Sequence, residues 1–416
     1  MHILFLTDNF PPEVNAPASR TFEHCREWAA AGHKVTVITC APNFPKGKVF
    51  SGYRNRLWQK EEMCGISVVR VWSYITANEG FARRVIDYLS YMISALLASL
   101  FIRRADIVIG TSPQFFTACA AYGVGWLKKI PFVFELRDIW PESIRAVGAM
   151  NQSAALGGLE KLELFLYRKA ALVVSVTHSF REDLTGRGID REKIRVVTNG
   201  LDATRFKPQG KDQTLVERHG LAGKFVSGYI GTHGLAHGLE TVLDAAEAIS
   251  CRPSGEKYRF LFLGDGAHKA QLIALATTKQ LKNVIFVDTV SKDEVVKYWS
   301  LLDASIIHLK KNELFRSVIP SKLFECMGMG IPVLHGVEGE SAGIVEKENV
   351  GLVFQPENAE ELCRKLVELS EDGALRRRLS INGQLAASRY DRRALASKML
   401  GYLEDLVAGR PPKYDL

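Results

Sequence analysis

Short apolar runs alternate with longer amphipathic segments along most of the chain. The runs are rich in β-branched and aromatic residues, as is typical of strands that a parallel sheet buries on both faces. The segments between them have the apolar spacing of helices. The runs that predict strands are residues 3–7, 35–39, 106–113 with its turn, 131–136, 172–176, 225–230, 259–263, 284–287, 304–308, 331–334 and 351–354. This alternation predicts an α/β protein with parallel sheets flanked by helices.

The length of 416 residues allows two sizeable cores, and a polar stretch near the middle divides the pattern. Asn199-Gly200 is a turn dipeptide, and residues 207–211 have the composition of a linker. We therefore expect a first domain at residues 1–205 and a second at 206–388. Residues 389–416 form a closing segment, in which residues 390–407 predict an amphipathic helix.

The most informative stretch is residues 316–333, which predict a loop, a short helix and a buried strand. Pro320 and Ser321 end the extended chain and can cap a helix, whose first turn carries free backbone N–H groups and the positive end of the helix dipole. Lys322 adds a charge there. Glu325 lies on the same helix face, so the stretch suits a pyrophosphate beside a ribose diol. The alternative is a capping box, although Glu325 falls one residue late for it.

A glycine-rich turn at residues 231–238 follows the strand at 225–230 and precedes a helix predicted at 239–249. Glycines allow backbone N–H groups to approach an anion, and the helix adds its dipole, so this turn predicts a phosphate cradle. The residues expected to contact a donor substrate here and in the later stretch are Gly231, His233, Gly234, His237, Lys322 and Glu325.

Candidate acceptor-binding residues lie in the first half of the chain. The loop at residues 8–17 follows the first strand and leads to Asn15 and Arg20, and the strand at 131–136 leads directly to Arg137, Asp138 and Glu142. Functional groups gather at the carboxyl ends of parallel strands, so we expect these side chains to hold an acceptor. The alternative is an Arg137–Asp138 pair that only fixes the loop.

Pro320-Ser-Lys-x-x-Glu325, followed by Met327-Gly-x-Gly-Ile-Pro-Val333, resembles the nucleotide-sugar motif of the retaining family-4 glycosyltransferases. Asn199-Gly-x-Asp-x-x-x-Phe206 is similar to the sequence at the domain junction in that family. The resemblance implies two Rossmann-like domains in the GT-B arrangement, with the C-terminal helix crossing back to the first domain. Residues 42–47 and 52–54 extend it to a bacterial polysaccharide subgroup that includes fucosamine-transferase-like proteins.

The chain departs from the family pattern at several positions. Ser317 stands eight residues before Glu325, where that family often has a second acid, and Thr232 and His237 stand where many relatives have Arg and Lys. A Gly-Gly pair usual near residues 16–17 is also lost. The positive partners available for a diphosphate are then His233, His237, Arg316 and Lys322.

The positive charge is concentrated in the first half. Residues 1–195 hold 25 Lys and Arg against 18 Asp and Glu, out of a net charge of +8 for the whole chain. No nucleic-acid-binding signature accompanies this charge, which fits an anionic membrane surface or a phosphate-linked lipid better. The uncharged run at residues 88–102 has 15 residues, too few to span a bilayer, which needs about 20. It predicts either a buried helix or a helix that docks on the membrane.

Seven cysteines without any Cys-x-x-Cys spacing indicate free thiols in a reducing compartment. The chain begins directly with a predicted strand, without the basic and apolar regions of an export signal. We therefore expect a cytoplasmic protein, peripheral on the inner face of the cytoplasmic membrane.

The resemblance implies a retaining, metal-independent transferase without a cofactor, which moves a sugar, of N-acetylated hexosamine type, from a UDP-sugar to a polyprenyl-linked or other membrane-associated acceptor. Bacterial surface polysaccharide such as O-antigen or capsule is the expected product. The expected catalytic residues are Asp138, Arg316 and Lys322. No Asp-x-Asp triplet occurs, so helix N-termini and basic side chains must stabilise the leaving diphosphate. The alternatives are a sugar-nucleotide epimerase and a non-catalytic partner that binds a sugar nucleotide or lipid.

Overall fold

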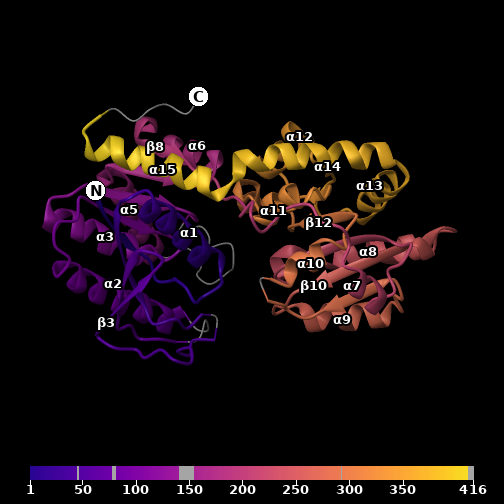
Figure 1. Cartoon of the computed structure of the whole chain (residues 1–416), viewed down its shortest axis with the longest axis horizontal. Helices are drawn as coiled ribbons and strands as arrows, with labels where there is room; N and C mark the ends of the chain where they lie inside the picture. Colours follow the sequence, from indigo (N-terminus) through magenta and orange to yellow (C-terminus); the bar gives the residue numbers. More distant parts are fainter. Residues whose placement is uncertain (45, 77–80, 140–153, 292, 411–416) are drawn as a thin grey trace. The chain divides into compact units, whose positions relative to one another are not determined.

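The computed structural model describes residues 1–44, 46–76, 81–139, 154–291 and 293–410. The chain divides into two compact units (Figure 1). Unit 1 combines Met1–Thr198 with Arg392–Leu416, and unit 2 is Asn199–Asp391. The division at Thr198 falls slightly before the boundary expected at residue 205.

The sheet of unit 1 has, in the described residues, eight strands in the order β3-β4-β2-β1-β5-β6-β7-β8. All pairs are parallel except β3 and β4, an antiparallel hairpin at one edge. The apolar pattern does not predict β3, because its residues Trp-Gln-Lys-Glu-Glu-Met are mostly polar and none is buried. The strands are β1 (His2–Leu6), β2 (Lys34–Cys40), β3 (Trp58–Met63), β4 (Ile66–Val71), β5 (Ile107–Thr111), β6 (Phe132–Leu136), β7 (Leu172–Ser175) and β8 (Ile194–Val196).

The described sheet of unit 2 has six parallel strands in the order β11-β10-β9-β12-β13-β14. Numbered along unit 2, this is the 3-2-1-4-5-6 order of the Rossmann fold. The predicted α/β class, with parallel sheets flanked by helices, is confirmed. The strands are β9 (Phe225–Ile230), β10 (Tyr258–Leu263), β11 (Val284–Val287), β12 (Ala304–His308), β13 (Val333–Gly336) and β14 (Gly351–Val353).

Helices cover the sheets, and apolar clusters form the core of each unit. Unit 1 contains α1 (Ala16–Ala30), α2 (Phe81–Leu100), α3 (Phe115–Lys128), α5 (Ala154–Lys169), α6 (His178–Gly186) and α15 (Arg392–Val407). Unit 2 contains α7 (Gln213–Arg218), α8 (Glu240–Ser250), α9 (Lys269–Thr278), α10 (Val295–Trp299), α11 (Lys322–Met329), α12 (Glu340–Glu348), α13 (Ala359–Glu371) and α14 (Gly373–Ala387), with the 3₁₀ turns η2 (Leu235–His237) and η4 (Glu313–Ser317).

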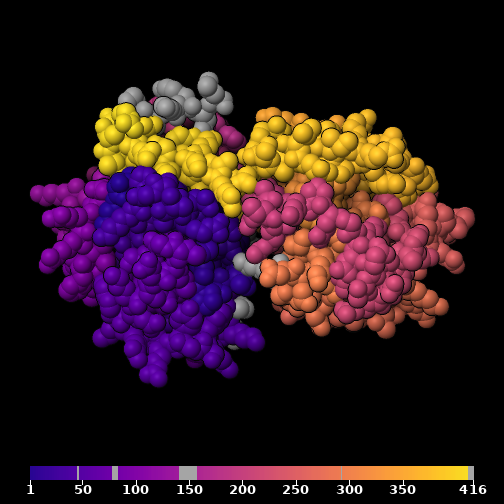
Figure 2. All heavy atoms as spheres, viewed as in Figure 1, coloured from indigo at the N-terminus to yellow at the C-terminus, as the bar shows by residue number. Residues whose placement is uncertain are grey.

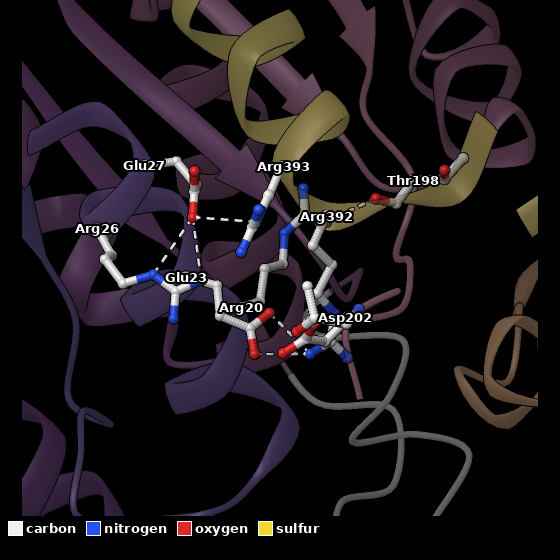
Figure 3. Close-up of polar contacts among 9 residues, drawn as sticks. Arg20, Glu23, Arg26, Glu27, Thr198, Asp202, Arg392 and Arg393 are labelled. Atoms are coloured by element: carbon white, nitrogen blue, oxygen red, sulfur yellow. Dashed lines mark hydrogen bonds and ion pairs between the residues drawn. The ribbon is translucent and has the colours of Figure 1, made fainter. Parts of the chain in front are cut away.

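The C-terminal helix α15 packs on unit 1 along α1, as the resemblance implied (Figures 1 and 2). Met399 and Leu403 are fully buried in the unit 1 core, and the indole Nε1 of Trp28 donates to the carbonyl of Ala396 at 2.8 Å. Figure 3 shows the polar side of this contact, where Glu23 binds Arg392 at 2.7 Å. The helix therefore completes the unit 1 core.

Helix α2 corresponds to the apolar segment expected at residues 82–104. Tyr91 and Ala95 on one face are fully buried, whereas Ile93 and Leu97 on another are more than half exposed. None of the helices in the described part of the chain combines the length and apolar character needed to span a bilayer. All seven cysteines are free thiols.

Candidate functional site

Each sheet has a point where the strand order reverses, and ligands of open α/β sheets bind there, outside the carboxyl ends of the strands. In unit 2 this point lies between β9 and β12, and in unit 1 it lies between β1 and β5. The loop at residues 231–238 follows β9, and the stretch with η4 and the start of α11 follows β12. The predicted donor residues therefore gather at the switch point of unit 2.

The glycine-rich loop lies with its backbone directly against the loop that follows β10. A β-carbon on Gly264, whose φ is +142°, would lie 1.9 Å from the carbonyl oxygen of Gly231. A β-carbon on Gly266 would lie 2.4 Å from the carbonyl oxygen of His233, and the backbone N–H of His233 donates to Asp265 at 2.9 Å. Only glycine allows this approach, so the two loops support each other backbone to backbone.

Lys322 lies beneath this loop at the first position of α11. Its Nζ is 3.6 Å from the ring centroid of Tyr229 and 2.9 Å from the place where a β-carbon on Gly231 would stand. Burial lowers the pKa of Lys322 to about 7, and the Glu325 carboxylate opposes that shift. An ammonium beside a helix N-terminus and a glycine loop suits a diphosphate. Tyr229, which sequence reasoning missed, holds Lys322 in place by a cation–π contact.

Glu325 is half-buried one turn into α11, and its charge acts on Lys322. Ser321 is the N-cap residue of α11, as predicted, but its side chain makes no capping hydrogen bond, so the capping box is not formed. Glu325 thus has the position expected of a group that accepts hydrogen bonds from a diol beside the diphosphate.

The two histidines of the loop are neutral at neutral pH. Burial and the Lys269 charge lower the pKa of His233 to about 4, and burial and the Lys322 charge lower the pKa of His237 to about 4. His233 is fully buried against Tyr229 and Phe262. Both histidines are therefore neutral in the unliganded protein, and the expectation that they become positive partners when a diphosphate binds stays a prediction.

His308, at the end of β12, fixes the far side of the loop. Its Nε2 accepts from the backbone N–H of Glu357 at 2.9 Å, so its Nδ1 carries the proton and donates to the carbonyl of His237 at 2.7 Å. The ring stacks on Phe354. A histidine at the end of a predicted strand was visible in the sequence, but its partners were not.

Arg316 lies on η4 and is half exposed, at 3.2 Å from Glu313. It lines a cavity of about 620 Å³ with Glu338, Phe354 and Gln355. The hydroxyl of Ser317, at the position of the family's second acid, donates to the carbonyl of Leu314. The guanidinium of Arg316 binds Glu313 and forms no contact with Lys322 within the described residues. The described residues also include no cluster of three or more His, Cys, Asp or Glu side chains placed to hold a metal ion.

Arg20 and Asn15, predicted to bind an acceptor, have structural tasks in unit 1. Arg20 is 5% exposed, and its Nε lies 3.0 Å from the carboxylate of Glu135. Its Nη1 and Nη2 donate to the carbonyls of Thr198 and Val197 at 2.7 and 2.9 Å. Asn15 caps α1 by accepting the backbone N–H of Ala18 at 2.9 Å. Arg20 therefore holds the end of the first chain segment, and its contact with an acceptor stays a prediction.

Two further buried charges, missed by the sequence reasoning, shape the loops at this edge. Arg70 is 2% exposed, and its guanidinium binds Glu61 at 2.6 Å and the carbonyls of Cys40 and Pro11. The carboxylate of Glu13 accepts the backbone N–H groups of residues 43 and 44, both at 2.8 Å. These bonds join residues distant in sequence, so no local signal reveals them.

Arg137 and Asp138 lie where the sequence places them, directly after β6. The Oγ of Ser112 accepts the backbone N–H groups of both residues, at 2.8 and 3.1 Å, which fixes the turn. The Nε and Nη1 of Arg137 are buried and have no hydrogen-bond partner in the described part of the chain. Arg137 therefore forms no pair with Asp138. Glu142 lies outside the described residues.

Two family descriptions match the chain. Residues 15–200 match "Glycosyl transferase 4-like domain", and residues 212–386 match "Glycosyl transferases group 1". The Escherichia coli protein named "Putative colanic acid biosynthesis glycosyl transferase WcaI" is 24% identical over 79% of this chain and 82% of its own length. The GDP-mannose-dependent alpha-mannosyltransferase of Mycobacterium tuberculosis is 23% identical over 85% of this chain and 84% of its own length.

Solved structures share the fold. Sucrose-phosphate synthase from Thermosynechococcus elongatus is 16% identical with a TM-score of 0.75, covering 98% of this chain and 99% of the other. Anabaena Alr3699/HepE in complex with UDP and glucose is 16% identical with a TM-score of 0.70, covering 97% and 99%. With both of its units matched by these families, the chain belongs to the family-4 glycosyltransferases of the GT-B fold.

Proposed function

We propose that this protein is a retaining, metal-independent glycosyltransferase that moves a sugar from a UDP-sugar to a membrane-associated acceptor in bacterial surface polysaccharide biosynthesis. The observation that carries the donor assignment is the position of Lys322. Its Nζ lies under the glycine-rich loop, at the N-terminus of α11 and against Tyr229. A diphosphate at this place meets backbone N–H groups, the helix dipole and one ammonium.

In this mechanism the protein positions the reactants and stabilises charge. Negative charge grows on the leaving diphosphate, and the groups that stabilise it are fixed in advance by the contacts among Gly231, Gly264 and Lys322. The departing phosphate oxygen takes the acceptor's proton on the same face of the sugar, so the configuration is retained without a protein nucleophile. Glu325 binds the ribose hydroxyls.

Relatives support the donor and product classes. WcaI is named for colanic acid biosynthesis, and the structures of HepE are titled as complexes with UDP and UDP-glucose. The mycobacterial relative is named for GDP-mannose, so the nucleobase needs a direct test. We infer UDP as the nucleotide and an N-acetylated hexosamine as the sugar.

The acceptor side of the proposal rests on an exposed face of unit 1. Ile93 and Leu97 of α2 are 54% and 55% exposed, and Phe101 and Trp126, beyond α2 and near the end of α3, are 76% and 72% exposed. The nitrogen of Lys128 donates to the carbonyl of Ile102, which brings the ends of α2 and α3 together. Exposed arginines flank the face at residues 83, 84, 103 and 104. We infer that this face docks on an anionic bilayer, on the inner side of the cytoplasmic membrane.

A thermal-shift panel of nucleotides and sugar nucleotides tests the donor. A ligand at 100 times its dissociation constant stabilises by about 2.7 kcal/mol, which is easily measured. UDP and UDP-sugars should raise Tm, and guanine nucleotides should not. The product formed with membrane lipid extract should retain the anomeric configuration of the donor. An altered sugar nucleotide without acceptor would instead indicate an epimerase, and donor binding without turnover would indicate a non-catalytic partner.

A further inference from the structure

The cations at the carboxyl edge of unit 1 are not all balanced by ion pairs. Arg20 pairs with Glu135 at 3.0 Å. Arg392 pairs with Glu23 at 2.7 Å (Figure 3). The charges of Arg20 and Arg392 repel the charge of Arg137, and Glu135 attracts it. Arg137 itself forms no ion pair within the described residues. One positive charge therefore remains without a partner of its own.

The acids around Arg137 do not supply that partner. Glu135 attracts it, but the Oε1 of this carboxylate accepts from Arg20, and its Oε2 has no hydrogen-bond partner in the described residues and so does not bind Arg137. Burial raises the pKa of Asp8, and Asp8 forms no ion pair with Arg137 in the described structure. Arg137 as a whole is half-buried, and leaving its buried Nε and Nη1 without acceptors is costly, so such a group is retained where a ligand supplies the missing acceptors.

The turn holds Arg137 in place without using its side chain. Ser112 accepts the backbone N–H groups of residues 137 and 138, and the turn follows β6, beside the switch point of the sheet. A guanidinium presents a planar fork of donors that matches the oxygens of a phosphate. Because the donor diphosphate is assigned to unit 2, a phosphate at Arg137 belongs to the second substrate.

We propose that Arg137 binds a phosphate group of the acceptor, so that the acceptor is a phosphate-bearing molecule. This inference rests on the proposed function, because it requires that unit 1 receives the acceptor. A polyprenyl diphosphate and a soluble sugar phosphate share the required chemistry.

The test titrates inorganic pyrophosphate by calorimetry into the full chain saturated with UDP, so that the donor site is already occupied. The unmodified protein should bind pyrophosphate under these conditions. Arg137→Gln should bind it at least tenfold more weakly, with its UDP affinity unchanged, and Arg137→Lys should keep part of the affinity. Unchanged pyrophosphate affinity in Arg137→Gln overturns the inference.

Thermal unfolding separates ligand binding from a structural role. Arg137→Gln removes an unpaired charge, so its Tm should stay the same or rise. The matched control Arg20→Gln removes a paired charge and should lower Tm. A comparable loss of Tm in Arg137→Gln would make Arg137 a structural residue and overturn the inference.

Farnesyl diphosphate and glucose 6-phosphate then distinguish the two sources of phosphate. If farnesyl diphosphate shows the stronger Arg137-dependent binding, the acceptor is lipid-linked. If glucose 6-phosphate does, the acceptor is a soluble sugar phosphate. Absence of Arg137-dependent binding for both overturns the inference while UDP binding still supports the donor site. Absence of UDP binding overturns the proposed function itself.

Discussion

The two sheets reverse their strand order at a comparable central point, but their carboxyl edges differ in chemistry. In unit 2 the edge is built from glycine loops, neutral histidines, Lys322 beneath the loop and Lys269, whose Nζ donates to the carbonyl of Gly264. In unit 1 it is built from buried charged side chains, of which Arg20 and Arg70 hold backbone carbonyls and carboxylates. Backbone N–H groups suit the diphosphate that nucleoside-diphosphate sugars share. Side chains, by contrast, can differ with the acceptor.

The largest expected effect concerns the buried pairs of unit 1. Arg20→Met leaves the Glu135 carboxylate buried without its partner and should lower the free energy of unfolding by about 3–5 kcal/mol at neutral pH. Arg20 and Arg137 lower the pKa of Glu135, so the stability from this pair is present at neutral pH and is lost as pH falls. The deficit of the variant, measured by denaturant unfolding, should therefore shrink toward pH 4. An equal deficit at pH 4 and pH 7 would contradict the ion-pair explanation.

The next effect concerns the ammonium of unit 2. Lys322→Ala should lower the turnover rate by about 10²–10³-fold, with a smaller loss of donor affinity, because the leaving-group charge grows in the transition state. Steady-state kinetics with direct donor titration separate the two. His237→Ala is the matched control in the same site and should affect turnover far less. Equal losses in rate and affinity for Lys322→Ala would assign the lysine to ground-state binding alone.

Glu325→Gln should weaken donor binding by about 1.5–3 kcal/mol, the value of a charge-assisted hydrogen bond. The loss should appear with nucleoside, nucleoside diphosphate and intact donor, whereas Lys322→Ala should affect only the two ligands that carry phosphate. Calorimetry on both variants makes the comparison. If nucleoside affinity is unchanged and Tm falls, Glu325 serves the helix and not the ribose.

Donor affinity should also depend on pH. The pKa of Lys322 is lowered to about 7, so the lysine is protonated below pH 7 and must regain a proton to bind a diphosphate above it. Affinity should fall as pH rises from 7 to 9, by up to about tenfold per unit. Since His237 is neutral throughout this range, His237→Ala should keep the dependence and Lys322→Ala should lose it. If the pH dependence disappears in His237→Ala, titration of the histidine, and not of Lys322, controls donor affinity.

The smallest effect per residue concerns the membrane face. Each arginine at positions 83, 84, 103 and 104 should contribute about 1 kcal/mol to binding of anionic vesicles, and high salt should release the protein. Co-sedimentation with anionic and neutral liposomes measures this. Replacement of Leu97 by Ser tests the apolar part, with the exposed Ile381 of unit 2 as a matched control. Equal binding to both kinds of vesicle would refute the charge argument.

The sequence predicted those parts of the molecule whose signals are local. The strands at 225–230, 284–287 and 304–308 match β9, β11 and β12 residue for residue, because each is a continuous apolar run. The placement of Lys322 and Glu325 on one helix was predicted correctly because residues three apart lie on the same face of a helix. The Arg20–Glu135 pair, 115 residues apart, was hidden because only the folded sheet brings its members together. Likewise, the lowered pKa of Lys322 depends on burial by Tyr229 and Gly231, which no spacing reveals.

The return of the chain to unit 1 at Arg392 has a consequence for synthesis. Unit 2 is one uninterrupted stretch, and its two ends meet where Leu201 pairs with Asp391. It can therefore fold as soon as it leaves the ribosome, as continuous domains generally do. Unit 1 emerges first but lacks Met399 and Leu403 of its core until translation is nearly finished. The core of unit 1 is therefore completed only after unit 2 has been synthesised, and a nascent chain stopped before α15 should expose the apolar face of α1 to chaperones.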